Sequence, residues 1–99
     1  MSVTPFIRPL ARQDMLDIWQ YTCDKWGRRQ ADRYLRELAE KLSVLAGMPE
    51  LGRAADYIFS GLRVYHFRHH IVLYQITATH IDIIRVLHER MDVTQHPLS

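Results

Sequence analysis

The 99-residue sequence predicts an α+β fold in which an antiparallel two-helix hairpin packs on one face of an antiparallel sheet. Two neighbouring segments, Pro9 to about Lys25 and Arg28 to Ala46, repeat apolar residues at helical spacing. The segment from Gly61 to Asp92 instead contains three runs rich in Val, Ile, Tyr and Phe, separated by short polar connections. A short N-terminal extended stretch completes the expected order β-α-α-β-β-β.

Composition indicates one globular domain spanning residues 1–99, because the chain is too short for a second core. The apolar share of 47% and charged share of 24% are ordinary for such a domain. No apolar run approaches the ~20 residues that span a bilayer, and the N-terminus lacks a signal-peptide core. The single Cys23 excludes an internal disulfide and suits a reducing cytoplasm. We therefore expect a cytoplasmic protein with no membrane segment.

Prolines and glycines predict where the first strand and the two helices begin and end. Val3 to Arg8 is expected to be extended at a sheet edge, and Pro9 fits the first position of a helix. Arg8 offers that helix no side-chain cap. Gly27 suits the end of the first helix, and Gly47 suits the end of the second.

Each helix has an apolar face. The first carries two adjoining stripes, formed by Ala11, Met15, Ile18 and Thr22 and by Leu16, Trp19, Cys23 and Trp26. The second carries Ala31, Tyr34, Leu35, Leu38, Leu42 and Leu45. Its outer face offers the i,i+4 pairs Arg33–Glu37, Arg36–Glu40 and Glu37–Lys41. Two such helices with so short a connection form an antiparallel hairpin.

The three strand runs are Leu62–Phe67, His70–Ile76 and His80–His88. Alternation assigns Leu62, Val64 and His66 to one side of the first run and Arg63, Tyr65 and Phe67 to the other. On the last run it assigns Ile81, Ile83, Arg85 and Leu87 against Asp82, Ile84, Val86 and His88. Because both sides of the last run are apolar, we expect a partner to cover the sheet face that the helices leave open.

The remaining segments give weaker patterns. Residues 48–60 are expected to form a connector with a turn at Gly52, in which Ile58 and Phe59 return to the core. Residues 93–99 are too short and polar to predict an element, so we expect a frayed tail held only by Leu98.

Five histidines, at positions 66, 69, 70, 80 and 88, lie within 23 positions and raise the question of a metal site. They have no companion cluster of cysteines or carboxylates, and His69 and His70 should diverge at a turn. We therefore predict no metal and no cofactor. Signatures of phosphate loops, dinucleotide sites and Ser/His/Asp hydrolases are also missing from the sequence.

A second group of residues has the chemistry of a metal-independent ribonuclease, which needs an acid, a base and cations around the reacting phosphate. The residues of these types are Arg53, Arg63, Tyr65, Arg85, His88 and Arg90. Arginines that alternate with apolar residues are more often solvated or in contact with a partner protein. The chain has no lysine after Lys41, and its net charge is only +2. Both facts weaken a phosphate site and a nucleic-acid-binding function.

Several phrases, in order, resemble the ParE toxins of the RelE/ParE superfamily. DMLDIWQYT (Asp14–Thr22) and WGRRQADRYLREL (Trp26–Leu38) are similar to the family's two helices. PELGR (Pro49–Arg53), GLRVY (Gly61–Tyr65) and IIRVLHERMD (Ile83–Asp92) then follow in family order. No single phrase is diagnostic, but five in order along nearly the whole chain are a much stronger indication.

The resemblance implies the toxic half of a bacterial type II toxin–antitoxin system, of the kind associated with plasmid stabilisation and growth arrest. It implies neutralisation by a ParD-like antitoxin, whose own N-terminal part binds operator DNA, so this chain is not expected to bind DNA sequence-specifically. ParE-type toxins are associated with inhibition of DNA gyrase, so we expect a non-enzymatic inhibitor that binds gyrase. The site residues would then contact the target or the antitoxin; they are Arg53, Arg63, Tyr65, Arg85, His88 and Arg90.

Two alternatives stay open. RelE-type relatives are ribosome-dependent endoribonucleases that cleave messenger RNA, and here Arg63, Arg85 and His88 would form the catalytic set. A degenerate toxin that only helps its partner regulate their operon is the third possibility. The lack of lysines in the second half favours the ParE side.

Overall fold

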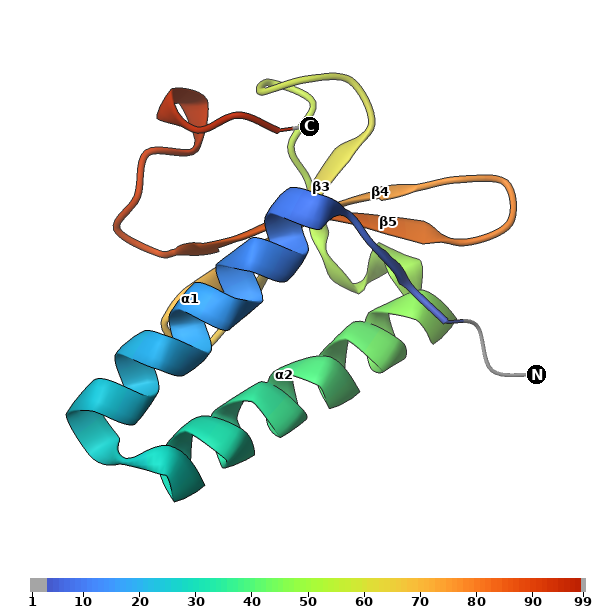
Figure 1. The fold of residues 1–99 in the computed structure, drawn as a ribbon. Helices are drawn as coiled ribbons and strands as arrows, with labels where there is room; N and C mark the ends of the chain where they lie inside the picture. The colour runs from blue at the N-terminus through green and yellow to red at the C-terminus, as the bar shows by residue number, and fades with distance from the viewer. Residues whose placement is uncertain (1–3, 99) are drawn as a thin grey trace.

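The computed structural model describes residues 4–98 and contains a helical hairpin and a five-stranded sheet (Figure 1). The elements are β1 (Phe6–Ile7), α1 (Pro9–Trp26), α2 (Arg28–Gly47), the 3-10 helix η1 (Pro49–Leu51), β2 (Arg53–Ala54), β3 (Leu62–Phe67), β4 (His70–Ile76), β5 (Ile81–His88) and the 3-10 helix η2 (Val93–Gln95). The predicted order β-α-α-β-β-β is confirmed.

The sheet order is β1-β5-β4-β3-β2, with the predicted meander β3–β4–β5 at its centre. The N-terminal strand lies at the edge as expected, although it pairs parallel to β5, so the sheet is mixed. Val3 lies outside the described residues. Strand β2 was not predicted, because two residues are too few to show alternation.

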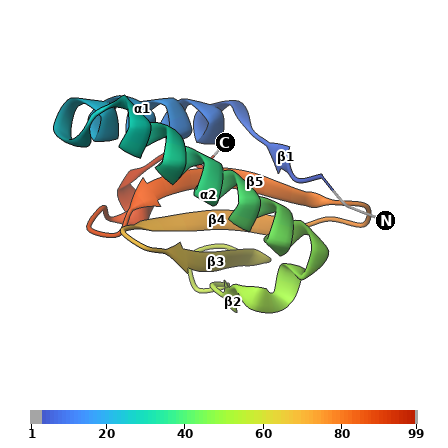
Figure 2. The same cartoon turned by 90° about the horizontal axis from the view of Figure 1, so that it is seen from below.

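Figure 2 shows the two helices side by side on one face of the sheet, as predicted. Gly27 joins them with a φ of 93°, a left-handed conformation that glycine adopts without strain. The uncapped start of α1 is fixed by β5 instead, because the Arg8 N–H donates to the Ile83 carbonyl at 3.0 Å and its guanidinium pairs with Asp82 at 2.9 Å. On α2, the expected Arg33–Glu37 pair is not formed, because Glu37 pairs with Arg68 at 2.9 Å.

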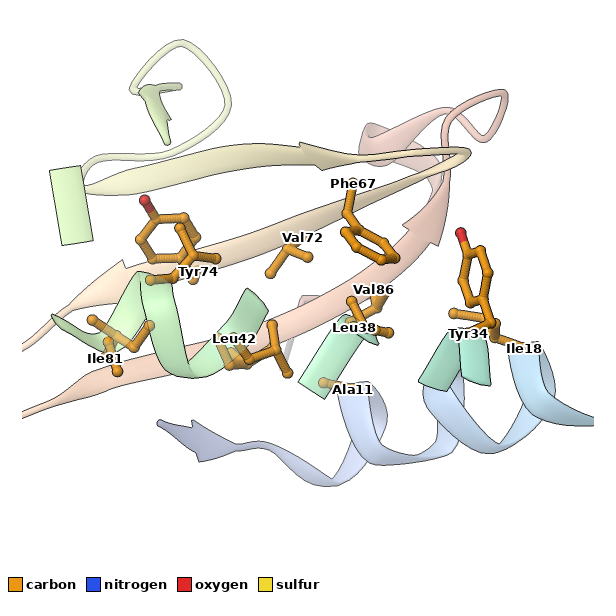
Figure 3. Packing of buried hydrophobic residues seen from close by; sticks show 13 residues of the cluster. Ala11, Ile18, Tyr34, Leu38, Leu42, Phe67, Val72, Tyr74, Ile81 and Val86 are labelled. Atoms are coloured by element: carbon orange, nitrogen blue, oxygen red, sulfur yellow. The ribbon is translucent and has the colours of Figure 1, made fainter. Parts of the chain in front are cut away.

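The main core lies between the helices and the sheet (Figure 3). Its buried members are Ala11, Ile18, Tyr34, Leu38, Leu42, Leu45, Ala46, Phe67, Val72, Tyr74, Ile81, Ile83 and Val86. Full burial of one such leucine side chain contributes about 1.5–3 kcal/mol. The second apolar stripe predicted on α1 is only partly used, since Leu16 and Trp26 are exposed.

The opposite sheet face is also covered, which corrects the prediction that it stands open for a partner. A second cluster buries Ala55, Leu62, Val64, Leu73, Ile84 and Leu87, with Ile58, Phe59, Ile71, Val93 and Leu98 packed against them. The connector after η1 and the C-terminal tail therefore close this face. The tail also contains η2, an element that the sequence did not predict, and Val93 packs on the core together with Leu98.

A β-bulge changes which sheet face the later residues of β5 point to. Leu73 pairs with Arg85 and the next residue, Tyr74, pairs with Ile83, so Ile84 is the extra residue. A bulge reverses the alternation beyond it. Val86 therefore joins Ile81 and Ile83 in the main core, and the predicted assignment of β5 is wrong after Ile84.

Candidate functional site

Arg85 lies at the β5 bulge and is held inside the fold. Its Nε and Nη2 donate to the two carboxylate oxygens of Asp14 on α1, at 2.7 and 2.8 Å, and its Nη1 donates to the Pro97 carbonyl at 2.6 Å. The Val86 N–H donates to the same carboxylate at 2.9 Å. Both side chains are 11% exposed, and the hydrogen bonds to Asp14 raise the pKa of Arg85 above its ordinary value. Arg85 thus joins α1, the C-terminal half of β5 and the tail.

Arg63 on β3 has a comparable role at the other edge of the sheet. Its Nε and Nη2 donate to the Gly52 carbonyl at 3.1 and 2.7 Å. The Gly52 N–H donates to the Tyr74 hydroxyl at 2.8 Å, which in turn donates to the Pro49 carbonyl at 2.5 Å. We call Arg63, Gly52, Tyr74 and Pro49 the connector latch, because they fix η1 and β2 to the sheet.

The other four candidate residues are divided between two places. Arg53 and Tyr65 line a shallow hollow beside β2 and β3, together with Leu51, Val64 and His66. His88 ends β5, two strands away, and its Nδ1 accepts the N–H of the exposed Arg90 at 3.1 Å. The structure therefore does not gather the six predicted residues into one site.

His88 leads to a feature that the sequence did not indicate, a chain of rings on the β4–β5 pair. His88 packs edge-on against His70, with ring centres 5.4 Å apart, and the Tyr34 hydroxyl meets His70 Nδ1 at 2.7 Å. Burial, with His88 and His69 nearby, lowers the pKa of His70 to about 4. Burial also raises the pKa of Tyr34. At neutral pH the His70 and Tyr34 side chains therefore carry no charge, although they are polar.

This ring chain forms the floor of a groove along α1. Two adjoining hollows share Tyr21, His70 and His88, and we call them together the α1 groove. The first is also lined by Thr22, Lys25, Trp26, Gln30, Tyr34, Arg68 and His69. The second is also lined by Asp14, Asp17, Ile18, Arg85, Val86, Leu87, Met91 and His96.

The α1 groove combines exposed apolar side chains with a basic rim. Trp26 is 73% exposed, Tyr21 60% and Met91 45%. Lys25 lies 5.5 Å from the centre of the Tyr21 ring, and Arg68 lies 5.8 Å from that of Tyr34. The signal for this surface was present in the sequence, because the apolar face of α1 is wider than one sheet can cover.

Within residues 4–98, no three His, Cys, Asp or Glu side chains come together in a way that could hold a metal ion. His66 and His69 both pair with Glu89, at 2.9 and 3.3 Å, and His80 pairs with Asp82 at 2.8 Å. Within the described part of the chain, no helix has the length and apolar character needed to cross a membrane.

Comparison with known proteins agrees with the resemblance seen in the sequence. The family model described as "ParE toxin of type II toxin-antitoxin system, parDE" matches residues 6–93. Toxin ParE1 of Mycobacterium tuberculosis (strain H37Rv) is 40% identical over 97 residues, which cover 97% of this chain and 99% of the relative. Toxin ParE1 of Caulobacter vibrioides is 35% identical over 86 residues, covering 87% and 88% of the two chains.

A solved structure has the same fold. A chain of the structure titled "Chromosomal ParDE TA system from P. aeruginosa" superposes with a TM-score of 0.76 at 15% identity, over 88% of this chain and 96% of that one. The family match and the curated relatives each cover most of the chain. The chain therefore belongs to the family of ParE toxins of type II toxin–antitoxin systems.

Proposed function

We propose that this toxin acts in the cytoplasm by binding and inhibiting DNA gyrase, without enzymatic activity, and that a ParD-like antitoxin neutralises it. Family membership supplies the class of protein. The observation that carries the choice of a binding mechanism is the engagement of Arg63 and Arg85 inside the fold.

A metal-independent ribonuclease must direct cations at the phosphate that reacts. Arg63 gives its donors to main-chain carbonyls of the connector, and Arg85 gives its donors to Asp14 and Pro97. Moving either guanidinium to a substrate would leave buried acceptors unpaired, at a cost of about 1–3 kcal/mol for each group. The same geometry disfavours a RelE-type catalytic set made of Arg63, Arg85 and His88.

We place the proposed antitoxin contact in the α1 groove. An amphipathic segment binds by laying apolar side chains into a groove, and acidic residues on its border would meet the basic rim. Trp26, Tyr21 and Met91 offer the apolar contacts. Lys25 offers a positive charge, and Arg68 offers the N–H donors that its ion pair with Glu37 does not use. His88 belongs to this groove and Arg90 lies beside it. Arg53 and Tyr65 form a separate hollow, which remains available for the target.

Induced expression in bacteria tests the proposed target. We expect filamentation and a DNA-damage response while bulk protein synthesis continues, and we expect co-expression of the antitoxin to restore growth. The matched measurement is a map of messenger-RNA 5′ ends after induction. Cuts in phase with codons, together with an arrest of translation within minutes, would sink the gyrase proposal in favour of the ribonuclease. Normal growth without antitoxin would instead indicate a degenerate toxin.

A further inference from the structure

The first half of α2 carries a cluster of four arginines that lies outside the α1 groove. Arg28, Arg29, Arg33 and Arg36 border one surface hollow, in which Asp32 is the only other lining residue. All four arginines are exposed. We call them the α2 arginine stripe. From Arg28 to Arg36 the stripe extends along the helix for about 12 Å.

The charges of the stripe are not neutralised within the fold. None of its four arginines forms an ion pair with a carboxylate anywhere in residues 4–98. Glu37, the i+4 partner of Arg33, is paired with Arg68 instead, and the Asp32 carboxylate accepts the Trp19 Nε1–H at 2.8 Å. These guanidinium groups are therefore free to bind an external anion.

The position of the stripe is unfavourable for the helix itself. α2 has no acidic residue in its first turn and no side-chain cap at Gly27, whereas Arg28 and Arg29 place two positive charges there. Helix N-termini carry a partial positive charge and favour anionic side chains. A bound polyanion would remove both the repulsion among the arginines and their conflict with the helix dipole.

We propose that the α2 arginine stripe binds the phosphate backbone of duplex DNA without sequence preference. Arginine's planar fork matches phosphate oxygens, and a 12 Å row corresponds to about three or four base-pair steps of duplex. The choice of DNA among polyanions rests on the proposed gyrase target, because gyrase holds duplex DNA. The stripe would bring the toxin against DNA beside its target.

An acidic peptide is the competing occupant, and the lining of the hollow argues against it. An amphipathic peptide needs apolar contacts, which the α1 groove provides through Tyr21 and Trp26. The hollow of the stripe is lined by charged side chains alone. A phosphodiester backbone can bind such a surface, since phosphate contacts need only charge and hydrogen-bond donors.

Fluorescence anisotropy with the full chain, made by cell-free synthesis, and a labelled duplex tests this proposal. We expect binding that weakens between about 50 and 200 mM salt with a log–log slope of about −3.6, one phosphate for each arginine. Arg29→Gln/Arg33→Gln should reduce that slope to about −1.8. The matched control, Arg12→Gln/Lys41→Gln, removes the same charge elsewhere and should keep the original slope. Circular dichroism verifies that both variants are folded.

Three outcomes would overturn the proposal: no binding of duplex at low salt, equal slopes for the test and control variants, or displacement by polyglutamate but not by unlabelled duplex. A strong preference between two duplexes of unrelated sequence would also contradict it. A parallel supercoiling assay keeps the two proposals apart. A chain that inhibits gyrase but does not bind duplex refutes only the DNA contact, and one that binds duplex without inhibiting gyrase refutes only the gyrase target.

Discussion

Arg85 and the α2 arginine stripe are made of the same residue type in opposite surroundings. Arg85 is 11% exposed and makes two hydrogen bonds to Asp14 and one to Pro97, whereas the arginines of the stripe are exposed and make no ion pair within the described chain. The side chain that resembles a catalytic cation in the sequence is one of the fold's own supports. The difference shows that an arginine is available for function only where its donors are not already used.

Removing one arginine of each kind tests this difference most strongly. Arg85→Ala leaves the Asp14 carboxylate buried without its partner, so we expect the free energy of unfolding to fall by about 3–5 kcal/mol. Arg33→Ala, at the exposed stripe, should change it by less than about 0.5 kcal/mol. Urea denaturation of both variants measures the difference. Equal losses would show that Arg85 does not hold the fold.

The connector latch is tested by two glycines. A Cβ at Gly52 would lie against the Tyr74 hydroxyl and only 2.7 Å from the ring Cε1, so Gly52→Ala should cost about 1–3 kcal/mol of stability. At Gly47, the last residue of α2, nothing lies within 4 Å of the added atom. Gly47→Ala should therefore be neutral or stabilise the helix by up to about 1 kcal/mol. A harmless Gly52→Ala would contradict the latch.

The helix ends and Arg85 also show what the sequence could and could not predict. Helical spacing, strand runs and the ends at Gly27 and Gly47 were correct, because each depends on residues close together in the chain. The bulge at Ile84 and the pairing of Asp14 with Arg85 depend on contacts between distant segments. Since local patterns carry no signal for such contacts, Arg63 and Arg85 could not be recognised as structural residues.

The α1 groove was missed for a related reason. Its floor joins Tyr34, His70 and His88 from three different elements, and no spacing brings these positions together. Its apolar rim was visible as the second stripe on α1, but that stripe was interpreted as part of a face to be buried, whereas Trp26 is exposed. For the proposed antitoxin surface, the wide apolar face of α1 was a better guide than the clustering of histidines.

Acid should weaken the fold through His70. The pKa of His70 is lowered from 6.5 to about 4, so between these values the unfolded chain binds a proton that the folded chain does not. The stabilising contribution of uncharged His70 is therefore fully present above about pH 6.5 and is lost as the pH falls toward about 4. The free energy of unfolding should fall by about 1–2 kcal/mol over this range, after allowing for partial solvent exposure. When the free energy of unfolding is measured across this pH range, the slope against pH that comes from His70 should be missing in His70→Gln. The exposed His66→Gln is the control, and a slope that survives in His70→Gln would rule His70 out.

The smallest effect on folding is expected at the α1 groove. Trp26 is 73% exposed, so Trp26→Ala should change stability by less than about 0.5 kcal/mol while weakening antitoxin binding at least about tenfold. Tyr57, which is 79% exposed and lies in the connector, is the matched control. Calorimetric titration with the antitoxin compares the two variants. Equal affinities would move the antitoxin contact away from the α1 groove.

The mechanism that we propose for this ParE-family toxin is binding of gyrase and not cleavage of RNA. The most direct measurement is a supercoiling reaction with purified gyrase, relaxed plasmid and the full chain, run beside a reaction with ribosomes that hold a messenger RNA. We expect supercoiling to stop as toxin is added, to resume when antitoxin is added first, and the message to stay intact. Undiminished supercoiling at a molar excess of toxin, with the message cut on the ribosome, would contradict the claim.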